Sequence, residues 1–419
     1  MKKVLALFFA LNSAFYYAQD YTHQVIIVNE GYFDYQTNEI LTPVSIGSYS
    51  LANNVYTEMA VVENMRFASD ALIKNEILYL AADSKILKYN LNTFELIDEV
   101  SLPGVRNLGI FNDYLVATRG EYQMSFDSYL KVYNTNDLSL VYSFDTLNGP
   151  KWATQNISIY NDIAYVAVNN AYVWGEEKGI IGQLNLSNMT YGNELSLGEN
   201  GKNPDNMFIN GDFLYTVNNK DWSGASVSKV SLGQQSIETV DIANAITGCG
   251  TSALRDDRLI YQISMETSLN EYDLDVMNNI GPVNNHTMNY YELAQNPVDG
   301  NLFASETDFF SFGTVHIFNS SNEVLNSFSA SVSPGIILFD NRPLSNSLEE
   351  SNSVEFSAYP NPTSEIVQFS GKNACIAVYN ISGEELFRST ESKINISELP
   401  SGVYIAKNDN GSMARFIVR

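Results

Sequence analysis

The sequence predicts an all-β protein, a seven-bladed β-propeller followed by a small C-terminal β-sandwich. Three observations lead to this prediction. A four-strand pattern recurs along most of the chain, helical periodicity is nearly absent, and aromatic residues are abundant, with 26 Tyr and 22 Phe against 23 Lys and Arg. Aromatic side chains favour pleated, half-buried sheet surfaces, and repeats at a fixed period are typical of propellers and solenoids.

The repeat consists of a short apolar strand, a tight Asn/Asp/Gly turn and a second strand with a Leu-Tyr-like core. Clear copies occupy residues 71–80, 108–116, 157–166 and 207–216, and further copies begin near residues 253 and 293. Consecutive copies lie about 36 to 50 residues apart, which is the range of four-stranded blades. Asn, Asp and Gly suit these turns because they tolerate the positive φ of tight hairpins.

Residues 24–62 precede the first clear copy and read as one more blade with an enlarged loop. Seven blades over Gln24–Asp340 follow, and a closed ring of blades removes exposed sheet edges. We therefore assign residues 20–340 to the propeller. A β-sandwich or a β-helix is the structural alternative, but neither accounts for a four-strand unit at this spacing.

Residues 1–19 have the layout of a secretory signal peptide. Lys2 and Lys3 precede an apolar segment, and the small residue Ala18 lies just before the expected cleavage point. A buried N-terminal strand is the alternative. No later stretch approaches the ~18 apolar residues that a membrane-spanning helix needs, so we expect no transmembrane segment in the mature chain.

The C-terminal part changes character after Asp340. Residues 341–353 are rich in Ser and Asn and read as a linker, and residues 354–419 read as a compact all-β unit. This unit contains four motifs in order: Tyr359-Pro-Asn-Pro-Thr-Ser364, Val378-Tyr-Asn-Ile-Ser-Gly383, Leu399-Pro-Ser-Gly-Val-Tyr-Ile405 and Phe416-Ile-Val-Arg419. It resembles the type A sorting domain of the type IX secretion system of Bacteroidota. The resemblance implies export by the type IX machinery and a secreted protein at the cell surface, on the outer-membrane exterior.

Composition and motifs exclude several classes of function. The formal net charge of −25 argues against nucleic acid as a partner, because phosphates need basic groups. The three histidines are scattered, and no G-x-S-x-G or H-E-x-x-H motif is present. Cys249 and Cys375 fall in different predicted domains, so we expect no disulfide between them. We expect no catalysis, no cofactor and no metal, and a propeller lyase or lactonase is the least favoured alternative.

The long connections of the predicted blades gather on one face of the propeller. With strands named A to D from the axis outwards, these are the B–C and D–A connections, and they hold all three tryptophans. Each tryptophan taken alone is more often a packing residue, but aromatic rings with a few polar groups make a good binding surface. The sequence therefore predicts a ligand site formed by Arg106, Arg119, Tyr122, Trp152, Trp174, Asp205, Trp222 and Phe310.

The propeller also carries motifs of a known group. Val28-Asn-Glu-Gly-Tyr-Phe33, Gly47-Ser-Tyr-Ser50 and Asn203-Pro-Asp-Asn206 resemble the YncE-like surface propellers of Bacteroidota. That group includes the vitamin B12-capturing BtuG-type proteins, which sit on a TonB-dependent outer-membrane transporter. The resemblance implies a surface protein that captures cobalamin or another corrinoid for such a transporter. This chain departs from those proteins in lacking a lipobox cysteine. A surface adhesin, or a propeller that binds glycan or protein, is the alternative.

Overall fold

The computed structural model describes residues 20–220, 222–247, 251–344, 356–370, 375–409 and 413–419. The chain divides into two compact units, one ending at Pro343 and the other containing Leu344–Arg419. Apart from one 3-10 turn, η1 (Glu199–Gly201), the regular structure of the described residues consists of strands, so the all-β prediction is confirmed. The predicted signal peptide, most of the predicted linker and Cys249 lie outside the described residues.

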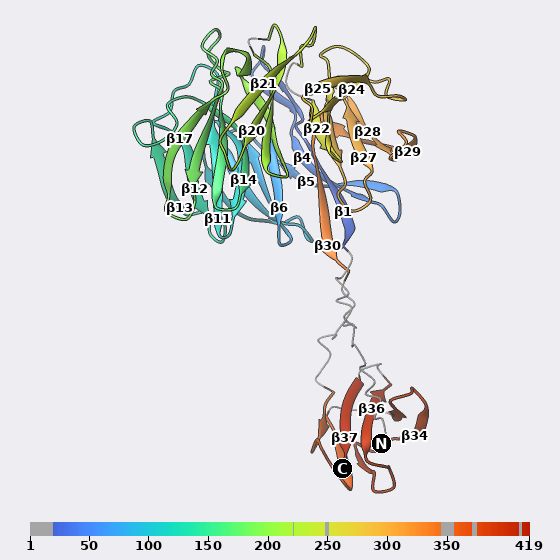
Figure 1. The fold of residues 1–419 in the computed structure, drawn as a ribbon. Helices are drawn as coiled ribbons and strands as arrows, with labels where there is room; N and C mark the ends of the chain where they lie inside the picture. Colours follow the sequence, from blue (N-terminus) through green and yellow to red (C-terminus); the bar gives the residue numbers. More distant parts are fainter. Residues whose placement is uncertain (1–19, 221, 248–250, 345–355, 371–374, 410–412) are drawn as a thin grey trace, which may run out of the picture. The chain divides into compact units, whose positions relative to one another are not determined.

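The first unit contains seven four-stranded antiparallel sheets, which are the blades of a propeller (Figure 1). Six of them are built from consecutive strands, and we number them blades 2 to 7. Blade 2 consists of β6 (Ala68–Lys74), β7 (Ile77–Ala82), β8 (Lys85–Asn90) and β9 (Leu96–Ser101). Blade 3 consists of β10 (Val105–Phe111), β11 (Tyr114–Arg119), β12 (Ser128–Asn134) and β13 (Leu140–Asp145). Blade 4 consists of β14 (Thr154–Tyr160), β15 (Ile163–Val168), β16 (Ile180–Asn185) and β17 (Thr190–Ser196). Blade 5 consists of β18 (Pro204–Asn210), β19 (Phe213–Asn218), β20 (Ala225–Ser231) and β21 (Ile237–Ile242). Blade 6 consists of β22 (Ser252–Arg255), β23 (Arg258–Gln262), β24 (Leu269–Asp273) and β25 (Asn278–Pro282). Blade 7 consists of β26 (Glu292–Gln295), β27 (Leu302–Glu306), β28 (Phe312–Phe318) and β29 (Val324–Val332).

Blade 1 joins the two ends of the propeller. Its strand order is β30 (Pro334–Pro343), β1 (Asp20–Asn29), β4 (Val44–Ser50) and β5 (Val55–Val62). The innermost strand therefore comes from the end of the unit, and it pairs with β1 from Asp20↔Pro343 to Asn29↔Pro334. The enlarged loop expected in this blade forms a separate hairpin, β2 (Tyr32–Asp34) with β3 (Glu39–Thr42). The strand β30 also continues three residues past the predicted domain end at Asp340.

Two-residue turns connect strands A and B in blades 2 to 6. In blades 2 to 5 they are Asn75-Glu76, Asn112-Asp113, Asn161-Asp162 and Gly211-Asp212. The first residue of each turn has a positive φ, between 49° and 57°, which is the backbone geometry of the tight hairpins expected from Asn and Gly. The A–B and C–D turns cover one face of the propeller, which we call the turn face. The B–C and D–A connections cover the opposite face, which we call the loop face.

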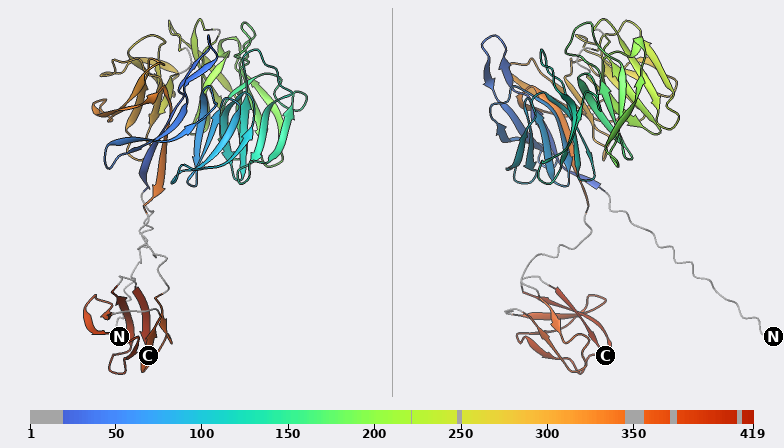
Figure 2. Two further views of the ribbon diagram at one scale, coloured as in Figure 1. Left: turned by 180° about the vertical axis from the view of Figure 1, so that it is seen from behind. Right: turned by 90° about the vertical axis from the view of Figure 1, so that its left-hand side faces the viewer.

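The propeller core consists of layers between neighbouring blades. Val28 and Ile46 of blade 1 pack with Leu78 and Leu80 of blade 2, and equivalent clusters join other neighbours. Burial of each such side chain is worth about 1.5–3 kcal/mol. Figure 2 shows the propeller from two further sides. The ring fixes where each loop of the loop face can lie.

The second unit has two small antiparallel sheets of its own. One contains β31 (Ala358–Tyr359), β32 (Ile366–Phe369) and β35 (Lys393–Asn395), and the other contains β33 (Ile376–Asn380), β34 (Glu385–Ser389), β36 (Gly402–Asn408) and β37 (Met413–Val418). Phe369 and Phe416 are fully buried between them, and the whole core cluster comes from residues 356–418. The unit therefore has a core independent of the propeller.

Candidate functional site on the loop face

Exposed aromatic side chains concentrate on the loop face. The described propeller residues include eight aromatic residues classed as exposed, and six of these lie in B–C loops or at their ends. Their exposed fractions run from 48 to 71 %: Tyr35, Tyr122, Trp174, Phe309, Phe310 and Phe312. Exposed apolar side chains that gather in a contiguous patch, unlike scattered ones, make a candidate binding surface.

These rings form two clusters over different blades. Over blades 1 and 7, Phe310 meets Tyr32 of the β2–β3 hairpin edge to face, with ring centroids 5.0 Å apart, and Phe309 meets Tyr291 in the same way. Over blades 4 and 5, Trp174 lies 6.2 Å from Trp222, with the two rings inclined at 38°. Such aromatic pairs present wide apolar surface at little cost in side-chain entropy.

Two arginines alternate with aromatic rings between these clusters. The guanidinium groups of Arg66 and Arg106 each lie 5.3 Å from the ring of Phe67, and Arg106 lies 4.5 Å from the ring of Tyr172. Glu121 balances both charges, at 3.1 Å from Arg66 and 3.4 Å from Arg106. The hydrogen bonds and charge of Asp83 and Glu121 hold the pKa of Arg66 above its usual range, so this guanidinium is charged.

Four carboxyl groups lie near the propeller axis. Asp70, Asp205 and Glu292 belong to innermost strands, and Glu30 follows β1 and reaches across Gly335, where a Cβ would lie 2.2 Å from its Oε1. Burial raises the pKa of Glu30, Asp70 and Asp205 to about 7. Burial and the charges of Glu30 and Asp70 raise the pKa of Glu292 to about 8. The axis is therefore acidic and partly protonated near neutral pH.

The eight residues predicted from the sequence have different environments. Arg106 and Asp205 lie within innermost strands rather than in loops, each as the second residue of its strand. The register of both strands is interrupted there, as in a β-bulge, and bulges re-aim side chains locally. Arg106 donates to the Gly120 carbonyl at 2.6 Å, and Asp205 accepts from the Asn219 amide at 3.0 Å.

Arg119 and Trp152 belong to the packing of the propeller. Arg119 is 5 % exposed, donates to the carbonyls of Pro103 and Ser128, and lies 3.8 Å from the ring of Phe126. Burial lowers its pKa. Trp152 packs against the core between blades 3 and 4, with the Lys178 ammonium group 5.4 Å from its ring. Tyr122, Trp174 and Phe310 are exposed on the loop face, and Trp222 is partly buried beside Trp174.

Sequence reasoning missed Glu30, Arg66, Phe67, Asp70 and Glu292. A signal for one of them was present in the repeat, since the third residue of the innermost strand in blades 2 to 5 is Asp70, Asn107, Asn156 or Asn206. Aligning the repeats strand by strand marks this position as polar in four blades. No such register signal marks Arg66 and Phe67, which lie in the connection between β5 and β6.

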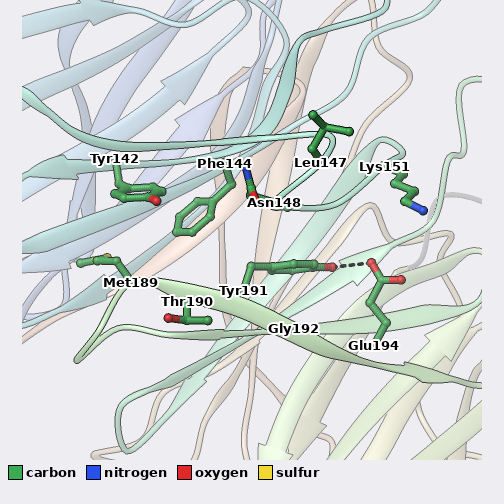
Figure 3. Close-up of a pocket in the computed structure, with 11 residues that line it drawn as sticks. Tyr142, Phe144, Leu147, Asn148, Lys151, Met189, Thr190, Tyr191, Gly192 and Glu194 are labelled. Atoms are coloured by element: carbon green, nitrogen blue, oxygen red, sulfur yellow. Dashed lines mark hydrogen bonds between the residues drawn. The ribbon is translucent and has the colours of Figure 1, made fainter.

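A cavity lies between the outer strands β13 and β17. It has a volume of about 520 Å³ and is lined by the side chains drawn in Figure 3, which include Tyr142, Phe144, Met189 and Tyr191. The Tyr191 hydroxyl donates to Glu194 at 2.8 Å. The Tyr191 ring also lies against Gly182, where a Cβ would be 2.1 Å from its oxygen. The ring of Tyr191 thus covers a glycine in the neighbouring strand, which is a packing role.

The described residues contain no group of three or more His, Cys, Asp or Glu arranged to hold a metal ion. They also contain no helix long and apolar enough to cross a bilayer. Cys375 is a free thiol.

Comparison with known proteins identifies the C-terminal unit. Residues 357–419 match the model of the secretion system C-terminal sorting domain family. The chain therefore carries a type IX sorting tail, and the protein is secreted and displayed at the cell surface. No curated protein sequence matches the chain.

Solved structures share the propeller architecture at low sequence identity. The extracellular domain of BT4673 from B. thetaiotaomicron, described as a hybrid two component system, aligns with a TM-score of 0.52 and 13% identity, over 96% of this chain and 59% of that one. Dihydro-heme d1 dehydrogenase NirN aligns with a TM-score of 0.52 and 12% identity, over 90% of this chain and 76% of that one. This chain spans less than two thirds of the BT4673 domain. At these identities the likeness concerns the fold alone.

Proposed function

We propose that this protein is a binding protein that captures an extracellular ligand on its loop face. The observation that carries the proposal is the concentration of exposed aromatic side chains there, six of eight in the described propeller, above an acidic axis. Exposed aromatic groups with a few converging polar groups are the usual composition of a ligand site. Secretion and surface display place such a site where nutrients and matrix polymers occur.

The ligand that the sequence resemblance suggests is cobalamin or another corrinoid, delivered to a TonB-dependent outer-membrane transporter. A corrin ring is broad and largely flat, so it can lie over aromatic rings such as those of Trp174 and Tyr122. Its amide side chains need hydrogen-bond donors, which the guanidinium groups of Arg66 and Arg106 supply. A glycan is the second candidate, supported by the paired indoles of Trp174 and Trp222.

The test is calorimetric titration of the full chain with cyanocobalamin. Tight binding that weakens at least tenfold in Trp174→Ala, and not in Val276→Ala, would support corrinoid capture on the loop face. Val276 is a suitable control because it is 71 % exposed, is apolar and lies in the turn between β24 and β25, on the opposite face of the propeller. Absence of heat and of a thermal shift at saturating cyanocobalamin would exclude the corrinoid.

A further inference from the structure

The strongest candidate for a defined subsite is the Trp174–Trp222 pair together with the buried polar network of the loops that carry it. Trp174 belongs to the B–C loop of blade 4 and Trp222 to that of blade 5. Trp174 is 69 % exposed, whereas Trp222 is partly buried and has a φ of 65°. The Trp222 backbone is fixed by a hydrogen bond from its N–H to the Asn219 carbonyl at 3.0 Å. The site therefore has one fixed ring and one exposed ring.

Three buried asparagines form a continuous polar chain in this region. Asn169, Asn203 and Asn219 are each 1 % exposed. The Asn169 amide donates to Asn203 Oδ1 at 3.2 Å, the Asn219 N–H donates to the Asn203 carbonyl at 3.0 Å, and the Asn219 amide donates to Asp205 at 3.0 Å. These bonds connect the B–C loops of both blades to the innermost strand of blade 5.

Two N–H donors in this cluster have no partner within the described structure. They are Nδ2 of Asn203 and Nε1 of Trp222. A buried donor without a partner costs about 1–3 kcal/mol. Such groups are rare in folded proteins, and each needs a specific explanation. Both donors belong to loops of the loop face, and one is part of the ring pair itself. An oxygen-bearing ligand at this place would satisfy a donor that the protein leaves open.

We propose that the Trp174–Trp222 cluster is a subsite for one saccharide ring. This inference rests on the proposed binding function of the loop face and specifies the ligand class. A pyranose has an apolar C–H face that stacks on an indole, and hydroxyl groups that both donate and accept hydrogen bonds. One hydroxyl oxygen accepts from Nε1 of Trp222, and another hydroxyl donates to the carboxyl group of Asp205. A purely apolar ligand leaves the Trp222 donor unsatisfied.

Access of a sugar hydroxyl to Nε1 of Trp222 requires a local side-chain movement, because this atom is covered in the structure. The indole of Trp174, which pairs with Trp222 and is mostly exposed, loses little packing on swinging outwards. A sugar ring that slides between the two indoles then has an aromatic ring on each side. The buried polar network of the loops stays in place and orients the ligand.

Intrinsic fluorescence gives a direct test, because the chain has only three tryptophans. The full chain carrying Trp152→Phe reports on Trp174 and Trp222 alone. It is titrated with linear hexasaccharides of glucose, xylose and mannose, and the affinity is measured by calorimetry. We expect a saturable change in emission with at least one of them. We expect Trp174→Ala to weaken binding at least tenfold, and Val276→Ala, on the turn face, to leave it unchanged.

Trp222→Phe separates the hydrogen bond from the stacking surface, because it keeps a ring and removes only Nε1–H and part of the area. We expect it to weaken binding about tenfold, which corresponds to about 1.4 kcal/mol. Asp205→Asn keeps the shape of the side chain and tests the second contact. Failure of all three hexasaccharides to bind, or binding that Trp174→Ala leaves unchanged, would overturn the saccharide subsite. Tight cyanocobalamin binding in the same preparation would then leave the proposed capture function standing.

Discussion

The carboxyl group of Glu30 accepts a hydrogen bond at 2.7 Å from the hydroxyl of Tyr291, a residue 261 positions later in the sequence. The contact links blade 1 to the connection before blade 7. Glu30 can reach this position because Gly335 on β30 has no side chain in the way. A Cβ at Gly335 would displace the carboxyl group, so the glycine of the closing strand decides where an axial acid lies.

The four carboxyl groups near the propeller axis, which we call the axial acids, should make the propeller less stable as pH rises. They are Glu30, Asp70, Asp205 and Glu292. Their pKa values in the folded protein are about 7 to 8, against 3.8 for Asp and 4.5 for Glu without the fold. The folded state therefore binds more protons than the unfolded state between about pH 4 and pH 8, and its stability falls as pH rises through this range. Thermal unfolding followed from pH 5 to pH 8.5 should show a decreasing Tm.

Glu292→Gln should remove part of this pH dependence. The amide keeps the shape of the side chain and cannot ionise, so we expect the variant to be more stable than the parent by about 1–2 kcal/mol at pH 8 and to differ little at pH 5. Glu63→Gln, at an exposed carboxyl group in the connection after β5, is the matched control. An unchanged slope of Tm against pH in Glu292→Gln would contradict the raised pKa of this carboxyl group.

Trp152 and Trp174 should differ in how much each contributes to the free energy of unfolding. Trp152 packs against the core between blades 3 and 4, so Trp152→Ala should lower the free energy of unfolding by about 2–4 kcal/mol. Trp174 is exposed, and Trp174→Ala should change it by no more than about 0.5 kcal/mol. Equilibrium urea unfolding measures both. Equal losses in the two variants would contradict the structure.

The pairing of β1 with β30, which closes the ring of blades, should be critical for the stability of the propeller. Ile26 and Ile27 on β1 are fully buried, and they belong to core clusters shared with blade 2 and with blade 7 respectively. Replacement of either by Ala should cost about 2–5 kcal/mol, from lost burial and the cavity left behind. The exposed Val55 on β5 offers a control, since Val55→Ala should have little effect on the urea midpoint.

The two units should unfold independently. Each has its own buried core, and the core of the sorting domain draws only on residues 356–418. Calorimetry of the full chain should therefore show two transitions. A chain that ends at Pro343 should retain the propeller transition within about 2 °C, because the β1–β30 pairing is complete at that residue. A large shift on truncation would mean that the tail stabilises the propeller.

Most of the fold was predictable from the repeat in the sequence. The turn pairs such as Asn112-Asp113 and the apolar strands beside them predicted blades and their spacing, because these features depend on neighbours in sequence. The origin of the innermost strand of blade 1 depends on a pairing between residues more than three hundred positions apart, Asp20 with Pro343. No local pattern contains that information.

The candidate site was predictable only in outline. Long loops with tryptophans identified the loop face, but they could not separate Trp152, which packs inwards, from Trp174, which is exposed. Arg119 was chosen because it begins a long B–C loop, and its side chain is instead held by backbone carbonyls. The axial acids were missed because the environment of Glu30 or Glu292 forms only where several blades meet. Residues that are distant in the sequence approach one another there, and a local sequence pattern does not reveal this.

The pairing of Asp20 with Pro343 also bears on mechanical load. Strand β30 runs from the loop face to the turn face, so the propeller's two ends emerge on the turn face. Tension applied through Pro343 along β30 is shared among the nine residue pairs that join it to β1, since strands pulled along their length must shear their hydrogen bonds together. A pull on the C-terminal end of the propeller in flowing fluid would thus load the seam of the ring along its strands, from the face opposite the long loops.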